Sequence, residues 1–100
     1  MIPEKINKSF NEQVQKELYS AYLYLAMSAY FLDKGLDGTA QWMRSQAFEE
    51  LVHAMKFFDH IAERDGRIEL EGIEKPQFEW KSALDAFNAA LKHEQYITGE

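Results

Sequence analysis

The stretch that decides the fold is residues 47–54, AFEELVHA, in which alanines, a glutamate and a histidine recur at helical spacing. Ala47 and Ala54 continue a seven-residue series that begins at Ala40, and small residues at this interval let two helices approach closely, as in helical bundles. Glu50 and His53 are three residues apart, so a helix places both side chains on one face. The stretch therefore predicts a packed helix that carries a carboxylate and an imidazole within its apolar row.

The same period extends outward in both directions and predicts two long antiparallel helices. The first covers residues 4–34 and the second residues 37–65, with Asp37 as the N-cap of the second and with Gly35 and Gly66 as the two helix stops. On the second helix, the inner row is Ala40, Met43, Ala47, Glu50, Ala54, Phe57 and Ile61. On the first helix, the apolar residues at three- and four-residue steps are Ile6, Phe10, Val14, Leu18, Ala21, Tyr22, Leu25, Ala29 and Leu32.

Residues 66–81 break the helical pattern, because apolar and charged residues alternate and Pro76 excludes a helix. Fully extended, the fifteen residues 66–80 reach up to roughly 50 Å, and a helix of 29 residues is about 43 Å long. This segment is therefore expected to run back along the whole second helix and to start a third helix, residues 82–100, parallel to it. The apolar row of the third helix is expected to be Ala83, Phe87, Ala90, Leu91 and Ile97. The fold class is all-α, in a single domain.

Composition excludes several classes of function. The chain has 11 Lys and Arg against 17 Asp and Glu, a net charge of −6, so it is a poor partner for nucleic acid or for an anionic membrane surface. The absence of cysteine excludes thiolate zinc sites, iron–sulfur clusters and a cysteine nucleophile. No basic-then-apolar leader is visible, which makes a cytoplasmic location the expectation.

Carboxylates interrupt the apolar row of every helix. Glu17 lies in the first helix, Glu50 with His53 in the second, and Glu94 in the third, while Lys and Arg lie mostly on other faces. A buried carboxylate needs a partner, and the Glu-x-x-His step is the one that di-iron and di-manganese carboxylate bundles use. A single Glu-x-x-His pair usually lies on a solvent-exposed face of a helix. A single glutamate in an apolar row usually extends its side chain so that the carboxylate reaches water. Because all three helices have a carboxylate in their apolar row, we favour a metal site, which would suit iron, manganese or zinc.

Three neighbouring residues allow more than one interpretation each. Glu49, next to Glu50, is either a ligand at the rim of the site or a surface charge. Tyr24, seven residues after Glu17, is either a core residue with a satisfied hydroxyl or a phenol near a redox metal. His93 is expected to be exposed, or to donate a hydrogen bond to a metal ligand, rather than to bind the metal itself.

The ordered set of these motifs resembles the non-haem bacterial and archaeal ferritins, over essentially the whole chain. The matching stretches are Asn11-Glu12-Gln13, residues 17–24 (ELYSAYLY), Trp42-Met43, residues 49–54 (EELVHA), Gly66-Arg67, the crossover with Pro76, and His93-Glu94. The resemblance implies a ferritin-like up-down four-helix bundle with a long crossover after the second helix. Of this bundle, the present chain holds helices one and two and the start of helix three.

The resemblance also implies a set of roles in a ferroxidase centre. Glu17, Glu50 and His53 resemble the ligands of the first iron position, with Glu50 bridging to the second position, where Glu94 is a ligand. Glu49 resembles a ligand of an accessory third position, and Tyr24 matches a tyrosine near the centre. The implied activity is that of an oxidoreductase, a ferroxidase that oxidises two Fe²⁺ with O₂.

The family stores the resulting Fe³⁺ as mineral inside a homo-oligomeric cage, with 24 subunits if this chain is completed. No haem is expected, because Leu51 stands where a bacterioferritin has its haem-ligating methionine. The family's fourth helix supplies further iron ligands and is absent from this chain. A second hypothesis is therefore a non-catalytic helical metal-binding or assembly module, a truncated ferritin-like chain that a partner chain completes.

Overall fold

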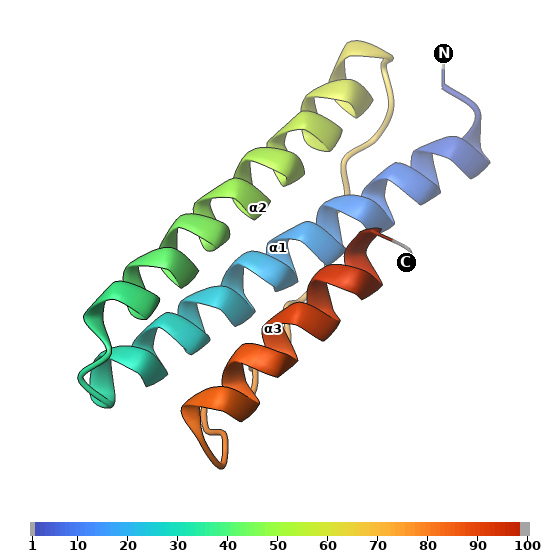
Figure 1. The fold of residues 1–100 in the computed structure, drawn as a ribbon. Helices are drawn as coiled ribbons and strands as arrows, with labels where there is room; N and C mark the ends of the chain where they lie inside the picture. Colours follow the sequence, from blue (N-terminus) through green and yellow to red (C-terminus); the bar gives the residue numbers. More distant parts are fainter. Residues whose placement is uncertain (1, 99–100) are drawn as a thin grey trace.

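A computed structural model describes residues 2–98, which form three helices: α1 (Glu4–Asp33), α2 (Asp37–Glu63) and α3 (Ala83–Thr98). The described residues contain no strand, and the all-α prediction is confirmed. α1 and α2 form an antiparallel pair, and α3 lies along α1 (Figure 1). Among residues 2–98, none of the helices has the length and apolar character that a membrane span requires.

The turn between α1 and α2 is closed by backbone hydrogen bonds. Gly35 has a φ of +74°, the left-handed conformation predicted for it, and the amide of Leu36 donates to the carbonyl oxygen of Phe31 at 2.9 Å. The N-cap prediction was wrong, because Leu36 caps α2 without a side-chain hydrogen bond and Asp37 is already helical. The carboxylate of Asp37 in the first turn still complements the positive end of the helix dipole.

α2 ends at Glu63, two residues before the predicted boundary, and α1 ends at Asp33, one residue before it. Asp65, not Gly66, adopts the left-handed conformation, with a φ of 58°, and Asp is one of the few residues with a side chain that tolerates it. Gly66 is required for a different reason. A Cβ at this position would lie 2.7 Å from Cγ2 of Ile61 and 2.9 Å from Cγ2 of Ile2, so the chain passes too close for a side chain.

The crossover between α2 and α3 is held by three polar residues of α1, one turn apart. The Nδ2 atoms of Asn7 and Asn11 donate to the carbonyl oxygen of Arg67 at 3.1 and 2.8 Å. Oδ1 of Asn11 accepts the amide of Glu69 at 2.8 Å, and Nε2 of Gln15 donates to the carbonyl oxygen of Gly72 at 2.7 Å. The segment runs back over the length of the hairpin, as expected, from Asn7 at its start to Tyr30 beside Trp80. Its hydrogen bonds are with α1, which the sequence did not predict. These side-chain amides form the hydrogen bonds that a partner strand would otherwise make with the extended backbone of the crossover.

The crossover delivers α3 to the far end of α1, so α3 runs antiparallel to α1 and parallel to α2 (Figure 1). The amide of Asp85 donates to Oγ of Ser82 at 3.1 Å, which caps the start of α3 one residue later than predicted. The predicted end of this helix at residues 99–100, and the side chain of Ile97, lie outside the described residues.

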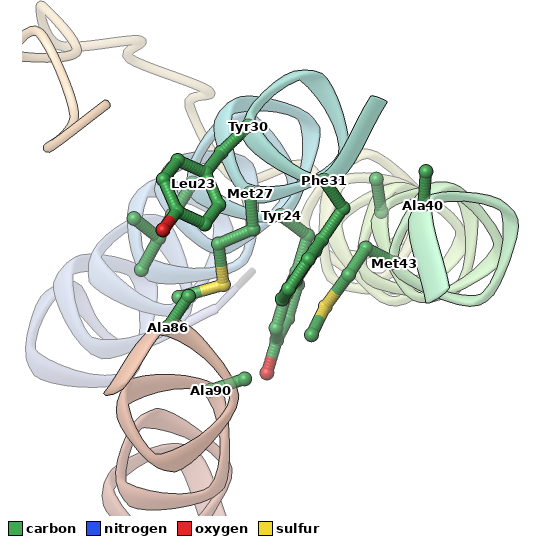
Figure 2. Packing of buried hydrophobic residues seen from close by; sticks show 10 residues of the cluster. Leu23, Tyr24, Met27, Tyr30, Phe31, Ala40, Met43, Ala86 and Ala90 are labelled. Atoms are coloured by element: carbon green, nitrogen blue, oxygen red, sulfur yellow. The ribbon is translucent and has the colours of Figure 1, made fainter. Parts of the chain in front are cut away.

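The core lies between the three helices, where Tyr24, Phe31 and Met43 point toward the small side chains of α3 (Figure 2). Ala86 and Ala90 are the buried residues of α3, while Phe87 and Leu91 of the predicted row are exposed. On α1 the row prediction was wrong at Ile6 and beyond Ala21. The residues predicted inside but found exposed are Ile6, Tyr22, Leu25, Ala29 and Leu32. Their places in the core are taken by Leu23, Tyr24, Met27, Tyr30 and Phe31.

Candidate metal centre

The antiparallel pairing of α1 and α2 brings Glu17 opposite Glu50 and His53. One ligand atom from each residue lies within 4.8 Å of the others, and both carboxylates are only 3% exposed. Nδ1 of His53 is 3.6 Å from Oε2 of Glu17 and 3.7 Å from Oε2 of Glu50. The imidazole side chain is 47% exposed, so the cluster is buried on the carboxylate side and open on the histidine side.

The two carboxylates differ in how their oxygens are satisfied. Oε1 of Glu17 accepts a hydrogen bond from Nε2 of Gln13 at 3.0 Å, which fixes the orientation of the group. Oε2 of Glu17 and Oε2 of Glu50 are buried and have no hydrogen-bond partner. Buried carboxylate oxygens without a donor are costly, and both of these atoms face Nδ1 of His53. Two oxygens and an imidazole nitrogen are a donor set that fits a divalent transition-metal ion.

The electrostatics of the cluster are those of acids crowded in a poorly solvated site. Burial, followed by the adjacent carboxylate of Glu17, raises the pKa of Glu50 to about 8. The charges of Glu94 and Glu49 act in the same direction. Glu50 therefore holds a proton at neutral pH when no cation is present.

Glu94 is brought to the site from α3 by a hydrogen bond with Tyr24. The buried hydroxyl of Tyr24 donates to Oε1 of Glu94 at 2.5 Å. Burial, and then this hydrogen bond, raise the pKa of Tyr24 well above its ordinary value, so the phenol stays protonated. Glu94 lies outside the tight group that Glu17, Glu50 and His53 form, and so does Glu49, whose side chain is exposed on α2.

Two contributions were missed from the sequence. Gln13 precedes Glu17 by four residues, a spacing that places two helical side chains together and could have been recognised. Ser20 and His93 were given no joint role, yet Oγ of Ser20 lies 2.7 Å from Nε2 of His93. Only the packing of α3 against α1 brings this pair together, so no local spacing reveals it.

Comparison with known proteins gives consistent matches over nearly the whole chain. Residues 7–100 match the family model Ferritin, described as a ferritin-like domain. A bacterial non-heme ferritin of Campylobacter jejuni is 39% identical over 98 residues, which are 98% of this chain and 59% of that protein. One of Bacteroides fragilis is 37% identical over 98 residues, 98% of this chain and 62% of the relative. The chain thus spans about three fifths of the length of these relatives.

Solved structures agree with this pattern. A closed form of the Archaeoglobus fulgidus ferritin, engineered by site-directed mutagenesis, superposes with a TM-score of 0.95 at 48% identity, over 99% of this chain and 60% of that one. The open-pore ferritin of the same hyperthermophilic archaeon gives a TM-score of 0.94 at 49% identity, over 98% of this chain and 60% of that one. At this identity the likeness covers sequence as well as backbone.

Proposed function

Because this chain belongs to the ferritin family, we propose that it serves iron storage and carries part of a ferroxidase centre. The observation that supports this most directly is the pair of unpartnered, buried oxygens on Glu17 and Glu50, with His53 beside them. In this proposal Fe²⁺ is the substrate. Each Fe²⁺ gives up one electron, and O₂ accepts the electrons of two such ions.

The residues have distinct parts in the proposal. Glu17, Glu50 and His53 hold the first Fe²⁺, and Glu50 bridges to a second position that Glu94 helps to form. Glu49 belongs to an accessory third position at the exposed edge of the site. Tyr24 keeps its proton and orients the carboxylate of Glu94 through its hydrogen bond.

Protonation links binding of the cation to the state of Glu50. The carboxyl holds a proton at neutral pH because burial and Glu17 raise its pKa to about 8. A divalent cation favours the ionised form, so the proton leaves as the cation binds. Gln13 holds Glu17 in place throughout, because its amide donates to the other oxygen of that carboxylate.

The wider biology of the family is part of the same proposal. The chain would act in the cytoplasm as a homo-oligomer, in a 24-subunit cage once the fourth wall of the bundle is supplied, and would store Fe³⁺ as mineral without haem. The second candidate is a non-catalytic metal-binding or assembly module that a partner chain completes. The stacked rings of Trp42 and Phe87, 5.8 Å apart and partly exposed between α2 and α3, favour an additional apolar partner at this place.

Aerobic addition of Fe²⁺ tests the proposal. The rise of ferric absorbance should be fast in the native chain and much slower in Glu50→Ala, while Glu63→Ala, an exposed acid at the far end of α2, should match the native rate. Equal rates in the native chain and in Glu50→Ala would refute the ferroxidase proposal. Mass in solution separates the two candidates, because a large particle that retains iron supports storage and a small complex that binds one ion supports the module.

A further inference from the structure

Ser20 is a fully buried polar residue on the face of α1 that meets α3, at 0% exposure. It lies between Glu17 and Tyr24 in the sequence. Its Oγ is 2.8 Å from the carbonyl oxygen of Lys16 and 2.7 Å from Nε2 of His93. A carbonyl oxygen only accepts hydrogen bonds, and a hydroxyl has a single hydrogen to give. Ser20 therefore donates to Lys16 and accepts from the N–H at Nε2 of His93.

This hydrogen bond lies one turn of α1 from the bond between Tyr24 and Glu94. Ser20 and Tyr24 are four residues apart on α1, and their partners His93 and Glu94 are adjacent on α3. Two such contacts close together fix both the rotation of α3 about its axis and its position along α1. The ring of His93 also meets the ring of Tyr24 edge to face, at 5.8 Å between centroids.

The buried apolar side chains of α3 are small. The buried residues of α3 are Ala86 and Ala90, which reach the core with a single methyl group each (Figure 2). The relative position of packed helices is set by the interlocking of larger side chains. A helix face made of alanines interlocks little with its neighbour. Phe87 stacks on Trp42 near the start of α3, and the polar contacts of His93 and Glu94 with α1 contribute to the register near the metal centre.

We propose that Ser20 and His93 are positioning residues, whose hydrogen bond holds α3 so that Glu94 stands at the second iron position. The inference rests on the proposed function, since it gives Glu94 the role of a ligand. The first position is independent of this contact, because Glu17, Glu50 and His53 come from α1 and α2 alone.

Titration of the metal-free 100-residue chain with Co²⁺, followed by visible absorbance and calorimetry, tests the proposal. The native chain should bind in two steps, of which Glu94→Ala removes the second. Ser20→Ala and His93→Phe should weaken the second step by roughly 3- to 10-fold, the effect of one neutral hydrogen bond, and leave the first step unchanged. His93→Gln keeps an N–H donor and should restore the second step.

Ser28→Ala is the matched control. Ser28 is another buried serine of α1, but its Oγ donates to the carbonyl oxygen of Ala40 in α2 at 2.8 Å. This variant should lower thermal stability while both Co²⁺ steps persist. The proposal is overturned if the second step is unchanged in Ser20→Ala and His93→Phe, or equally weakened in Ser28→Ala. A native chain with one step that Glu94→Ala does not alter overturns it as well, whereas the proposed function fails separately if Glu50→Ala leaves the first step intact.

Discussion

The hydroxyl of Tyr24 donates a 2.5 Å hydrogen bond to Oε1 of Glu94 and so connects the middle of α1 to α3. We expect Tyr24→Phe to lower the free energy of unfolding by about 1–3 kcal/mol, because a hydrogen bond to a carboxylate is lost at a buried position. Denaturant unfolding of the metal-free chain measures the change. Tyr22→Phe alters an exposed tyrosine of the same helix and should have little effect. Equal losses in the two variants would show that the hydrogen bond contributes nothing specific.

The stability of the metal-free chain should fall as the pH rises from about 4.5 to about 8. Burial and Glu17 raise the pKa of Glu50 from 4.5 to about 8, so between these values the folded chain binds more protons than the unfolded chain. Raising the pH over this range therefore favours unfolding. Above about pH 8, Glu50 is ionised in both the folded and the unfolded chain and no longer makes the stability depend on pH. Thermal unfolding at several pH values should show a flatter profile for Glu50→Gln. Parallel profiles for the two proteins would contradict the raised pKa.

Binding of Co²⁺ at pH 7 should release about one proton per chain from Glu50, because the cation favours the ionised carboxylate. Calorimetry in buffers of different ionisation enthalpy measures the number of protons directly. The number should decrease toward pH 9, where Glu50 is already ionised. Release that stays constant from pH 6 to pH 9 would assign the proton to another group.

Asn11 should contribute more to the crossover than Gln15 does. Asn11→Ala removes the hydrogen bonds to Arg67 and Glu69, whereas Gln15→Ala removes the single bond to Gly72. We expect losses of about 1–2 kcal/mol for Asn11→Ala and about half of that for Gln15→Ala. Amide exchange at Glu69 should accelerate in Asn11→Ala and remain unchanged in Gln15→Ala. The reverse order of the two variants would contradict the assigned contacts.

Gly66→Ala should destabilise the chain by about 1–3 kcal/mol, as overpacking does. The added Cβ would press on Ile61, which is fully buried and cannot move aside easily, and on Oδ1 of Asn7, which accepts the amide of Arg67. Gly72→Ala is the control, because nothing lies within 4 Å of a Cβ there. A comparison of midpoints in thermal unfolding measures the difference, and equal midpoints would mean that the contact at Gly66 relaxes at no cost.

Much of the architecture followed from the sequence because its signals are local. Gly35 ends the first helical pattern, Pro76 excludes a helix in the crossover, and the third helix begins within one residue of its predicted start. Glu17, Glu50 and His53 were singled out because they interrupt apolar rows, and the structure brings the three together. For α2, the buried residues Met43, Ala47, Ala54 and Ile61 all lie on the predicted row.

The inner face of α1 could not be chosen in the same way. This helix is apolar on two faces, so Tyr22 and Leu25 have the same helical spacing as Tyr24 and Met27. Only the positions of α2 and α3 decide which set is buried, and those positions depend on contacts between distant residues. The pairing of Ser20 with His93, 73 residues apart, is of this kind.

α2 and α3 share little direct contact in this fold. Within residues 2–98, no Cα of α2 lies within 8 Å of a Cα of α3, and α1 packs against both. A cation held jointly by Glu50 of α2 and Glu94 of α3 would therefore act as a cross-link between two helices that pack mainly against α1. Under the proposed function, iron loading would then govern the cooperativity of unfolding: the empty chain could release α3 from the α1–α2 hairpin, whereas the loaded chain would unfold as one unit.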